Sequence, residues 1–237
     1  MEYLLHIAIL VETYTILVIS LDLLAGHTGM LSVAHAGFYG IGAYTSALTV
    51  GHSDGRFIMG VAAGMVVAAL VSLVISLPSF RLRDDLFVIV TFGFQMILSS
   101  VLNNWVGLTR GPLGILGIPQ PDILGFTVDS QQRFAILAAA FVILAYVVVL
   151  RITSSPLGRV LHAIREDEML VEGMGKNVLR FKVVAFAVSA ALAASAGSLY
   201  AHYVTYIDPT SFTLMESVLL ISMVIIGGPG SPWGPFV

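Results

Sequence analysis

Residues 154–182 read SSPLGRVLHAIREDEMLVEGMGKNVLRFK and interrupt an otherwise apolar chain. Together with Arg151 just before it, this polar island contains six of the eleven Lys and Arg residues, and apolar runs long enough to cross a bilayer lie on both sides. Loops with an excess of Lys and Arg remain on the cytoplasmic side of a membrane. We therefore expect the polar island to be a cytoplasmic loop between two membrane spans.

The composition excludes a water-soluble globule. Of the 237 residues, 57% are hydrophobic and 11% are charged, and the mean hydropathy is +0.95, whereas about 25% of the residues in a soluble domain are charged. The absence of cysteine excludes disulfides, thiolate metal sites and cysteine nucleophiles. The N-terminus, MEYLLH, is acidic where a signal peptide is basic, so the first apolar segment is expected to be retained as a span.

Apolar segments occur along the whole chain, and each is compared with the roughly 20 residues that a span needs. We expect an all-α polytopic membrane protein with about six or seven transmembrane or re-entrant helices and one amphipathic cytoplasmic helix. One transmembrane domain is expected over residues 1–237, with a turn-rich loop at residues 103–132, where Gly and Pro are frequent. The expected apolar segments are residues 3–24, 31–50, 57–77, 86–102, 134–150, 183–203 and 215–226.

A second basic cluster supports the orientation. Arg81 and Arg83 are separated from the polar island by two expected spans, so both clusters lie on the same side of the membrane. Residues 103–132 are then outside. The N-terminus is also outside if residues 31–50 cross the bilayer completely, and inside if they form a re-entrant segment.

The polar island is expected to contain one amphipathic helix within residues 155–177. Ser155 can cap a helix whose first residue is Pro156, and Gly173 and Gly175 are expected to end it. Apolar residues recur at helical spacing, and charged residues occupy the other face. The positions at helical spacing are Leu157, Leu161, Ile164, Glu168 and Val171, of which all but Glu168 are apolar, and Val160 and Met174 widen the apolar stripe. The charged face consists of Arg159, Arg165, Glu166, Asp167 and Glu172.

Two kinds of surface could receive this helix. Anionic lipid head groups would attract its arginines, but they would repel the acidic residues at positions 166–168. The mixed charge favours a protein partner, with membrane lipid as the alternative.

Residues 31–50 read LSVAHAGFYGIGAYTSALTV, which is short and glycine-rich for a span. The glycines are compatible with tight helix packing and equally with a broken helix of the kind that lines transport pathways near the membrane midplane. The candidate pathway or broken-helix residues are His35, Gly37, Tyr39, Gly40, Gly42 and Tyr44.

Polar residues within the apolar segments are candidates for function, because ionisable groups in hydrocarbon are costly. Glu12 lies in the middle of its segment, whereas Asp22 and Glu216 lie near segment ends and Gln95 can bond a neighbouring helix. The six histidines include no pair at the i, i+4 spacing of a helical metal site, so we expect no bound metal. The chain lacks a phosphate-binding GxxxxGK[ST] motif and any basic–aromatic stripe typical of nucleic-acid binding.

Small residues recur at spacings of four in two apolar segments. Gly60 and Gly64 form one such pattern, and Ser189, Ala193 and Gly197 form another. Small residues let helix backbones approach closely in lipid. Both patterns therefore predict helix–helix contacts and carry little functional information.

Four blocks in this order resemble the permeases of bacterial ABC importers for branched-chain amino acids, the LivH/LivM family. They are LLAGHTGMLSVAHAGFYGIGAYTSAL (residues 23–48), RLRDDLFVIVTFGF with LNNWVGLTRGPLGILGIP (81–119), SPLGRVLHAIREDEMLVEGMGKN (155–177) and GGPGSPWGP (227–235). The second block is more similar to the LivM branch than to LivH. Asp84 stands where the family often has Gly. Family members usually continue past the last block, which implies truncation at the C-terminus.

The resemblance implies a permease without an ATPase site of its own, in the bacterial inner membrane. The implied partners are two ATP-binding cassette subunits that bind ATP and Mg²⁺, a second related permease chain and a periplasmic solute-binding protein that would meet residues 103–132 and 201–212. Residues 155–177 would be the coupling helix that docks on the ATPase, and replacing Ile164 or Arg165 is expected to weaken that contact. The coupling residues are Leu157, Arg159, Leu161, Ile164, Arg165, Glu166, Glu172 and Gly175.

Other functions remain open at this point. The same machinery could carry urea, short amides or other amino acids. An ion-coupled secondary transporter would use Glu12 or Asp22 and would need no ATPase. A non-transporting membrane scaffold or a decayed remnant would give no solute phenotype when deleted.

Overall fold

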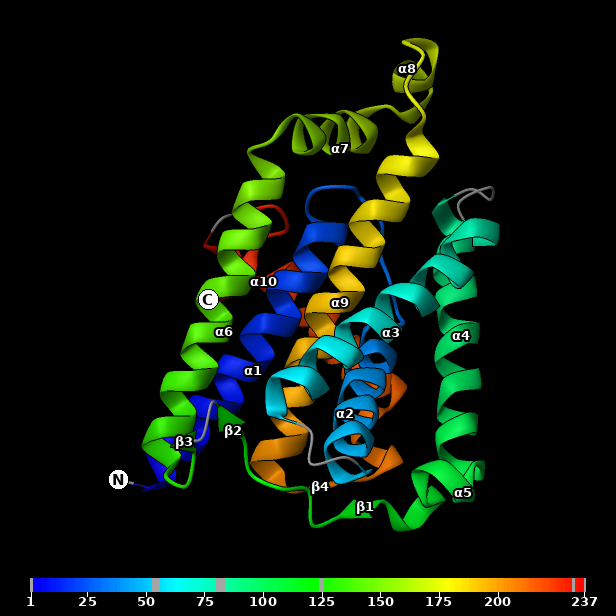
Figure 1. Cartoon of the computed structure of the whole chain (residues 1–237). Coiled ribbons are helices and arrows are strands. Elements are labelled where there is room, and N and C mark those ends of the chain that lie inside the picture. Colours follow the sequence, from blue (N-terminus) through cyan, green and yellow to red (C-terminus); the bar gives the residue numbers. More distant parts are fainter. Residues whose placement is uncertain (1, 53–55, 80–83, 124–125, 232, 237) are drawn as a thin grey trace.

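The computed structural model describes residues 2–52, 56–79, 84–123, 126–231 and 233–236 (Figure 1). Within these residues, five helices are long and apolar enough to cross a membrane. The all-α polytopic fold is therefore confirmed. These helices are α1 (Glu2–Ala25), α3 (Phe57–Ser79), α4 (Asp84–Asn104), α6 (Gln131–Thr153) and α9 (Val178–Val204).

Two shorter helices complete the bundle, α2 (His35–His52) and α10 (Leu214–Gly227). Helix α1 ends at Ala25, and residues 29–34 are not helical, so the expected segment 31–50 is an irregular stretch followed by a short helix. In Figure 1, this stretch descends from the α7 end of the bundle, and α2 lies in the opposite half. The chain thus returns to the far end of the bundle through an irregular stretch followed by a short helix. The N-terminus lies at the end opposite α7.

Helix α9 forms the centre of the bundle. It packs against α1, α2 and α3 and is the most buried of the five long helices, whereas α4 and α6 are the least buried. Close approach depends on glycine: a Cβ at Gly64 of α3 would lie 3.2 Å from Gly42 Cα on α2. The small-residue contacts predicted for Gly60 and Gly64 are confirmed, since both face α2.

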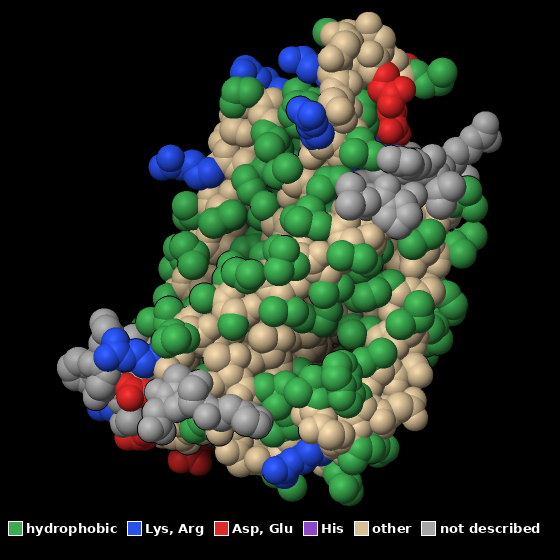
Figure 2. Space-filling view, turned by 45° about the vertical axis from the view of Figure 1, so that its right-hand side comes forward, with side chains coloured by type: hydrophobic (Ala, Val, Ile, Leu, Met, Phe, Trp, Pro, Cys, Tyr) green, Lys and Arg blue, Asp and Glu red, His purple; other side chains and the backbone are tan. Residues whose placement is uncertain are grey.

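The outer face is apolar across its middle. Figure 2 shows hydrophobic side chains over the middle of this face, with Lys, Arg, Asp and Glu near its two ends. Apolar side chains of α4 and α6, such as Ile97 and Ile136, are well exposed. This distribution fits a protein surrounded by lipid.

The end opposite α7 is closed by short elements. Strand β1 pairs antiparallel with β4, with Ile115 opposite Ile207. No described part of residues 103–130 spans the bundle, as expected for a turn-rich loop. Arg81 and Arg83, used to predict the orientation, lie outside the described residues. The short elements at this end are α5 (Val106–Thr109), η1 (Gly111–Leu113), β1 (Ile115–Leu116), β2 (Asp122–Ile123), β3 (Phe126–Thr127), β4 (Tyr206–Ile207) and η2 (Pro209–Phe212). The remaining short element, η3 (Gly234–Phe236), follows α10 and packs against it.

Candidate functional site

The polar island forms two helices, α7 (Pro156–Glu166) and α8 (Glu168–Gly173), that project from one end of the bundle (Figure 1). The start of α7 agrees with the prediction, because the Ser155 hydroxyl accepts hydrogen bonds from the backbone N–H groups of Leu157 and Gly158. Helix α7 lies across the end of the bundle, between α6 and the segment that leads to α9.

The prediction of a single helix through the polar island is wrong. Asp167 has extended backbone angles, φ −156° and ψ 102°, and its side chain accepts a hydrogen bond from the N–H of Leu170. A short acidic side chain of this kind offers the backbone a helix start in place of a continuing helix. The break allows α8 to point away from α7.

The two faces of α7 have different environments. Leu161 and Ile164 are buried, and Leu157 is half-buried, so these three predicted coupling residues pack against the chain itself. The exposed members of the predicted set are Arg159, Arg165, Glu166, Glu172 and Gly175.

Helix α8 presents apolar side chains to solvent at the tip of the projection. Met169, Leu170 and Met174 are 83%, 60% and 71% exposed. Met174, which was expected at the edge of the apolar stripe, follows directly after α8. Val171 is buried, and Lys182 of α9 donates to the Glu168 carboxylate over 2.7 Å, which ties α8 to α9.

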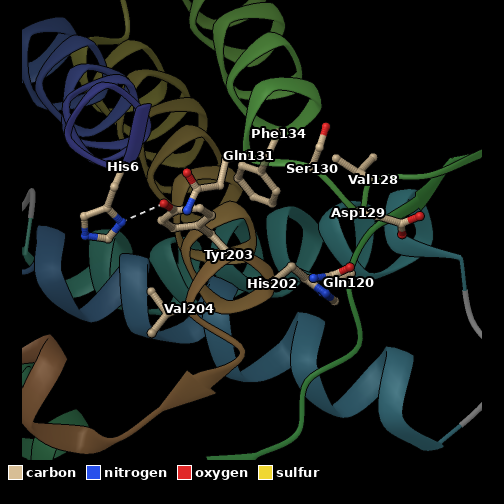
Figure 3. A pocket seen from close by; sticks show the side chains of 10 residues that line it. All are labelled: His6, Gln120, Val128, Asp129, Ser130, Gln131, Phe134, His202, Tyr203 and Val204. Atoms are coloured by element: carbon tan, nitrogen blue, oxygen red, sulfur yellow. Dashed lines mark hydrogen bonds between the residues drawn. The ribbon is translucent and has the colours of Figure 1, made fainter. Parts of the chain in front are cut away.

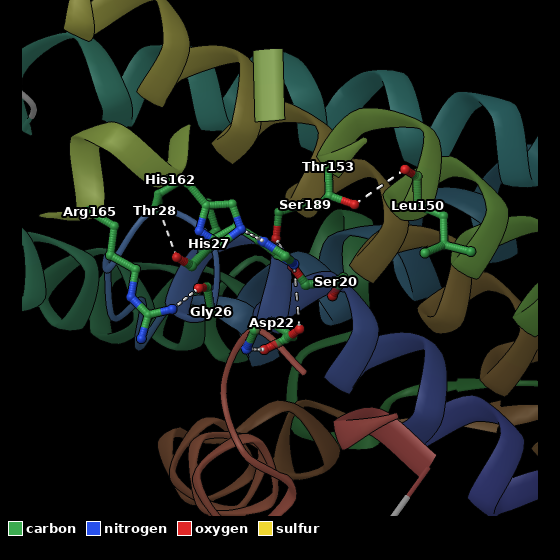
Figure 4. Close-up of polar contacts among 12 residues, drawn as sticks. Ser20, Asp22, Gly26, His27, Thr28, Leu150, Thr153, His162, Arg165 and Ser189 are labelled. Atoms are coloured by element: carbon green, nitrogen blue, oxygen red, sulfur yellow. Dashed lines mark hydrogen bonds and ion pairs between the residues drawn. The ribbon is translucent and has the colours of Figure 1, made fainter. Parts of the chain in front are cut away.

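A cluster of polar contacts joins α7 to the bundle (Figure 4). The Arg165 guanidinium donates to the carbonyl of Gly26 in the loop after α1. His162 Nε2 lies 2.9 Å from His27 Nδ1 in the same loop. The N–H of Gly230 donates to Asp22 Oδ1 over 2.8 Å. We call the group formed by Asp22, Gly26, His27, His162, Arg165 and Gly230 the junction.

Sequence reasoning missed most of the junction. It treated the histidines as isolated and placed Asp22 near a membrane interface, whereas Asp22 is buried. His27 and His162 are 135 positions apart, and Asp22 and Gly230 are 208 positions apart. No local spacing signals a contact of this kind.

His27 is held in its neutral form. Burial lowers its pKa to about 4, and the nearby His162 and Arg165 act in the same direction. The Asp22 carboxylate is its closest acid, with Oδ2 4.0 Å from His27 Nε2. A neutral imidazole can share one hydrogen bond with a second imidazole, whereas two protonated rings would repel each other.

The junction should therefore weaken in acid. The folded protein favours neutral His27, while the unfolded chain binds a proton near pH 6.5, so the stability that His27 contributes is complete above that pH and is lost as the pH falls towards about 4. We expect the midpoint of thermal unfolding in detergent to drop across this window, and less steeply in His27→Gln. A His6→Gln control at the opposite end should keep the original slope; equal slopes in all three proteins would contradict the expectation.

The predicted pathway residues lie on α2 and are buried between helices. His35 Nε2 lies 3.0 Å from the Ser189 hydroxyl of α9, and Tyr39 contacts the rings of Tyr200 and Phe212. Gly37, Gly40 and Gly42 allow close contacts with α4, η2 and α9, and Tyr44 also packs against Phe212. These contacts fit the interpretation of tight packing, and the broken-helix interpretation stays a prediction. The segment's role in a pathway also stays a prediction.

A polar hollow lies at the end opposite α7 (Figure 3). It has a volume of about 490 Å³ and is lined by residues from the starts of α1 and α6 and the end of α9. His6 Nδ1 lies 2.6 Å from the Tyr203 hydroxyl at its edge. Sequence analysis did not identify this hollow, whose polar lining residues include Gln120, Asp129, Gln131 and His202.

Comparison with known proteins agrees with this architecture. A family model described as "Branched-chain amino acid transport system / permease component" matches residues 3–237. The chain is 34% identical to the high-affinity branched-chain amino acid transport system permease protein LivM of Escherichia coli (strain K12), over 95% of this chain and 58% of that relative.

Two further relatives show the same pattern. Identity is 29% to the probable branched-chain amino acid transport permease protein LivM of Methanocaldococcus jannaschii, over 76% of this chain and 52% of that relative. Identity is 26% to the high-affinity branched-chain amino acid transport system permease protein LivH of Salmonella typhimurium, over 95% of this chain and 78% of that relative. The chain thus spans little more than half the length of these LivM relatives. No solved structure matches significantly.

Proposed function

The chain belongs to the family of branched-chain amino acid transport permeases, and from this membership we propose that it is the membrane subunit of an ABC importer for branched-chain amino acids. ATP and Mg²⁺ would bind to two partner ATPase subunits. The observation that carries the proposal is the α7–α8 projection, which extends beyond one end of an otherwise lipid-compatible bundle. Such an extension suits a permease that must receive movement from a partner.

The distribution of charge supports an orientation. The α7 end carries Arg151, Arg159, Arg165 and Arg180, so we assign it to the cytoplasm of a bacterial inner membrane. The opposite end, with the short strands and the polar hollow, would face the periplasm. A solute-binding protein would deliver the amino acid there.

We propose a revised ATPase contact. Ile164 is only 4% exposed, and Arg165 is bonded to Gly26, so neither side chain is free to enter a partner's groove. The exposed Met169, Leu170 and Met174 provide the apolar contact instead, since exposed apolar side chains beyond the lipid-facing region favour a protein interface. Arg159 and Glu166 would form its polar rim.

The second permease chain would pack on the exposed, apolar outer face of the bundle. Apolar helices associate in lipid through close packing and small residues. The relatives named LivM and LivH match the same chain, which supports pairing of two related permeases.

The test is uptake of labelled leucine in membranes that contain the chain, its paired permease, its ATPases and its binding protein. We expect ATP-dependent uptake that leucine, isoleucine and valine compete for. Uptake that needs no ATPase and is abolished by a proton or sodium ionophore would support a secondary transporter instead. If only urea or short amides competed for uptake, the chain would still be an importer subunit, but its solute would be a different one.

The same preparation tests the α8 tip. Met169→Ser, Leu170→Ser and Met174→Ser together should weaken ATPase co-purification on the order of tenfold, because apolar anchors dominate interface energies. A matched control replaces three similarly exposed apolar residues at the opposite end, Val106, Leu113 and Leu116, with serine. The control should retain the ATPases. If both variants retained the ATPases equally, α8 would not be part of the ATPase contact.

A further inference from the structure

We infer that the junction transmits movement of α7 to the two short helices, α2 and α10, and that Arg165 and His162 are the positioning residues that make this connection. The inference rests on the proposed function and goes beyond it. Docking on the ATPase would belong to α8, whereas the junction would pass the movement into the bundle.

The connection to α2 is short and direct. Arg165 holds the carbonyl of Gly26, and His162 pairs with His27. Thr28 then closes the end of α1 by donating to the Leu24 carbonyl over 2.7 Å. Residues 29–34 follow without helix and lead into His35, the first residue of α2. A displacement of Gly26 is therefore passed to α2 through the eight residues 27–34, of which the last six are not helical.

The connection to α10 uses the other side of the junction. Asp22 accepts a hydrogen bond from the N–H of Gly230, three residues after α10 ends at Gly227. Gly230 also lies against the Gly26 carbonyl and the Arg165 guanidinium, which make the connection to α2. A Cβ built at Gly230 would be 2.8 Å from Gly26 O and 3.2 Å from Arg165 Nη1. Arg165 thus contacts the point where the loops after α1 and α10 meet.

The two short helices also contact each other deeper in the bundle. The N–H of Ala36, in the first turn of α2, donates to the Ser217 hydroxyl of α10 over 3.0 Å. The neighbouring Glu216 accepts a hydrogen bond from Tyr14 of α1 over 2.9 Å. One pull at the junction therefore acts on a linked pair of helices. Each helix is joined to the junction by a non-helical segment, residues 29–34 before α2 and residues 228–230 after α10, so a rigid shift costs few backbone hydrogen bonds.

Arginine suits this position because of its geometry. Its guanidinium presents several donors in a fixed plane, so one side chain can hold a carbonyl while lying against a second loop. A merely structural contact would affect folding alone. A transmitting contact should change the number of solute molecules moved per ATP hydrolysed.

The experiment uses the complete importer in proteoliposomes and measures leucine uptake and ATP hydrolysis together. Arg165→Ala should retain the ATPases and their hydrolysis but lower the uptake per ATP about tenfold, the size of a typical coupling energy between sites. Arg165→Lys keeps a donor and should retain most of the ratio. Arg151→Ala, which removes an exposed arginine at the end of α6, is the matched control and should leave the ratio unchanged.

A short crosslink provides the rescue. The chain has no native cysteine, so His27→Cys and His162→Cys together introduce one defined pair in place of the two imidazoles. The ring nitrogens, and not the Cβ atoms, are 2.9 Å apart, so the pair is bridged by a short cleavable reagent that joins two thiols instead of by a direct disulfide. In the Arg165→Ala background, this crosslink should restore the uptake ratio several-fold, and its cleavage should remove the gain. Wild-type coupling in Arg165→Ala, or no rescue once mass spectrometry shows the crosslink, would overturn the inference. Loss of ATP-dependent uptake in the unaltered importer would instead overturn the proposed function, and the transmission role with it.

Discussion

Replacing Gly197 with valine should prevent the bundle from assembling. A Cβ at this position would press on the backbone carbonyl oxygen of Tyr39 and lie 2.8 Å from the backbone nitrogen of Ala43, both on α2. Backbone atoms cannot rotate away as a side chain can, so α2 and α9 would have to separate along a contact whose residues, such as Ala43 and Ala194, are fully buried. Overpacking ordinarily costs about 1–3 kcal/mol, and this case should exceed that range. Thermal unfolding and gel filtration in detergent would measure the loss.

Gly93 provides the matched control for this prediction. It lies within α4, and a Cβ there would meet nothing within 4 Å. Gly93→Val should therefore change the free energy of unfolding by less than about 1 kcal/mol, the range of helix propensities. Equal melting temperatures for the two variants would show that the α2–α9 contact tolerates a side chain at Gly197.

Reversing the charge of Lys182 should release α8 from the bundle. The Lys182 and Glu168 side chains are 4% and 34% exposed, so their 2.7 Å contact is largely shielded from water. In Lys182→Glu, two carboxylates would face each other there. Breaking a buried ion pair costs about 3–5 kcal/mol, and the partial exposure of Glu168 places the expected loss at the lower end. Hydrogen exchange of residues 168–177 should accelerate, and ATPase co-purification should fall.

The double reversal Lys182→Glu with Glu168→Lys should restore most of the protection. Arg180→Glu makes the same charge change two residues away, on an exposed side chain at the start of α9, and should leave exchange nearly unchanged. If the double reversal exchanges as fast as the single one, the attraction between these two side chains does not hold α8.

Local patterns were sufficient for the membrane helices. A run of about 20 apolar residues forms a span because the backbone of the run satisfies its own hydrogen bonds in lipid. For the same reason, the observed α3 and α6 lie where apolar runs were expected. Ser155 and Pro156 likewise marked the start of α7, since a cap depends on neighbours two or three residues away.

Within the polar island, the sequence could not separate two helices from one. The apolar spacing through residues 157–171 is compatible with a continuous helix, and Asp167 breaks it through a single side-chain hydrogen bond to Leu170. Which side of the helix meets the bundle was also undetermined. Helical spacing places Arg165 on the charged face of the helix, yet its guanidinium bonds to the Gly26 carbonyl.

Residue patterns along the chain were enough to identify an all-α membrane protein of the branched-chain amino acid permease family, with one basic projection between two spans. How that projection is attached follows from the packing of the folded bundle. His27 meets His162 and Asp22 meets Gly230 only after the bundle has assembled. Local spacing encodes helices because their hydrogen bonds are local, whereas contacts between distant loops depend on the packing of every helix between them.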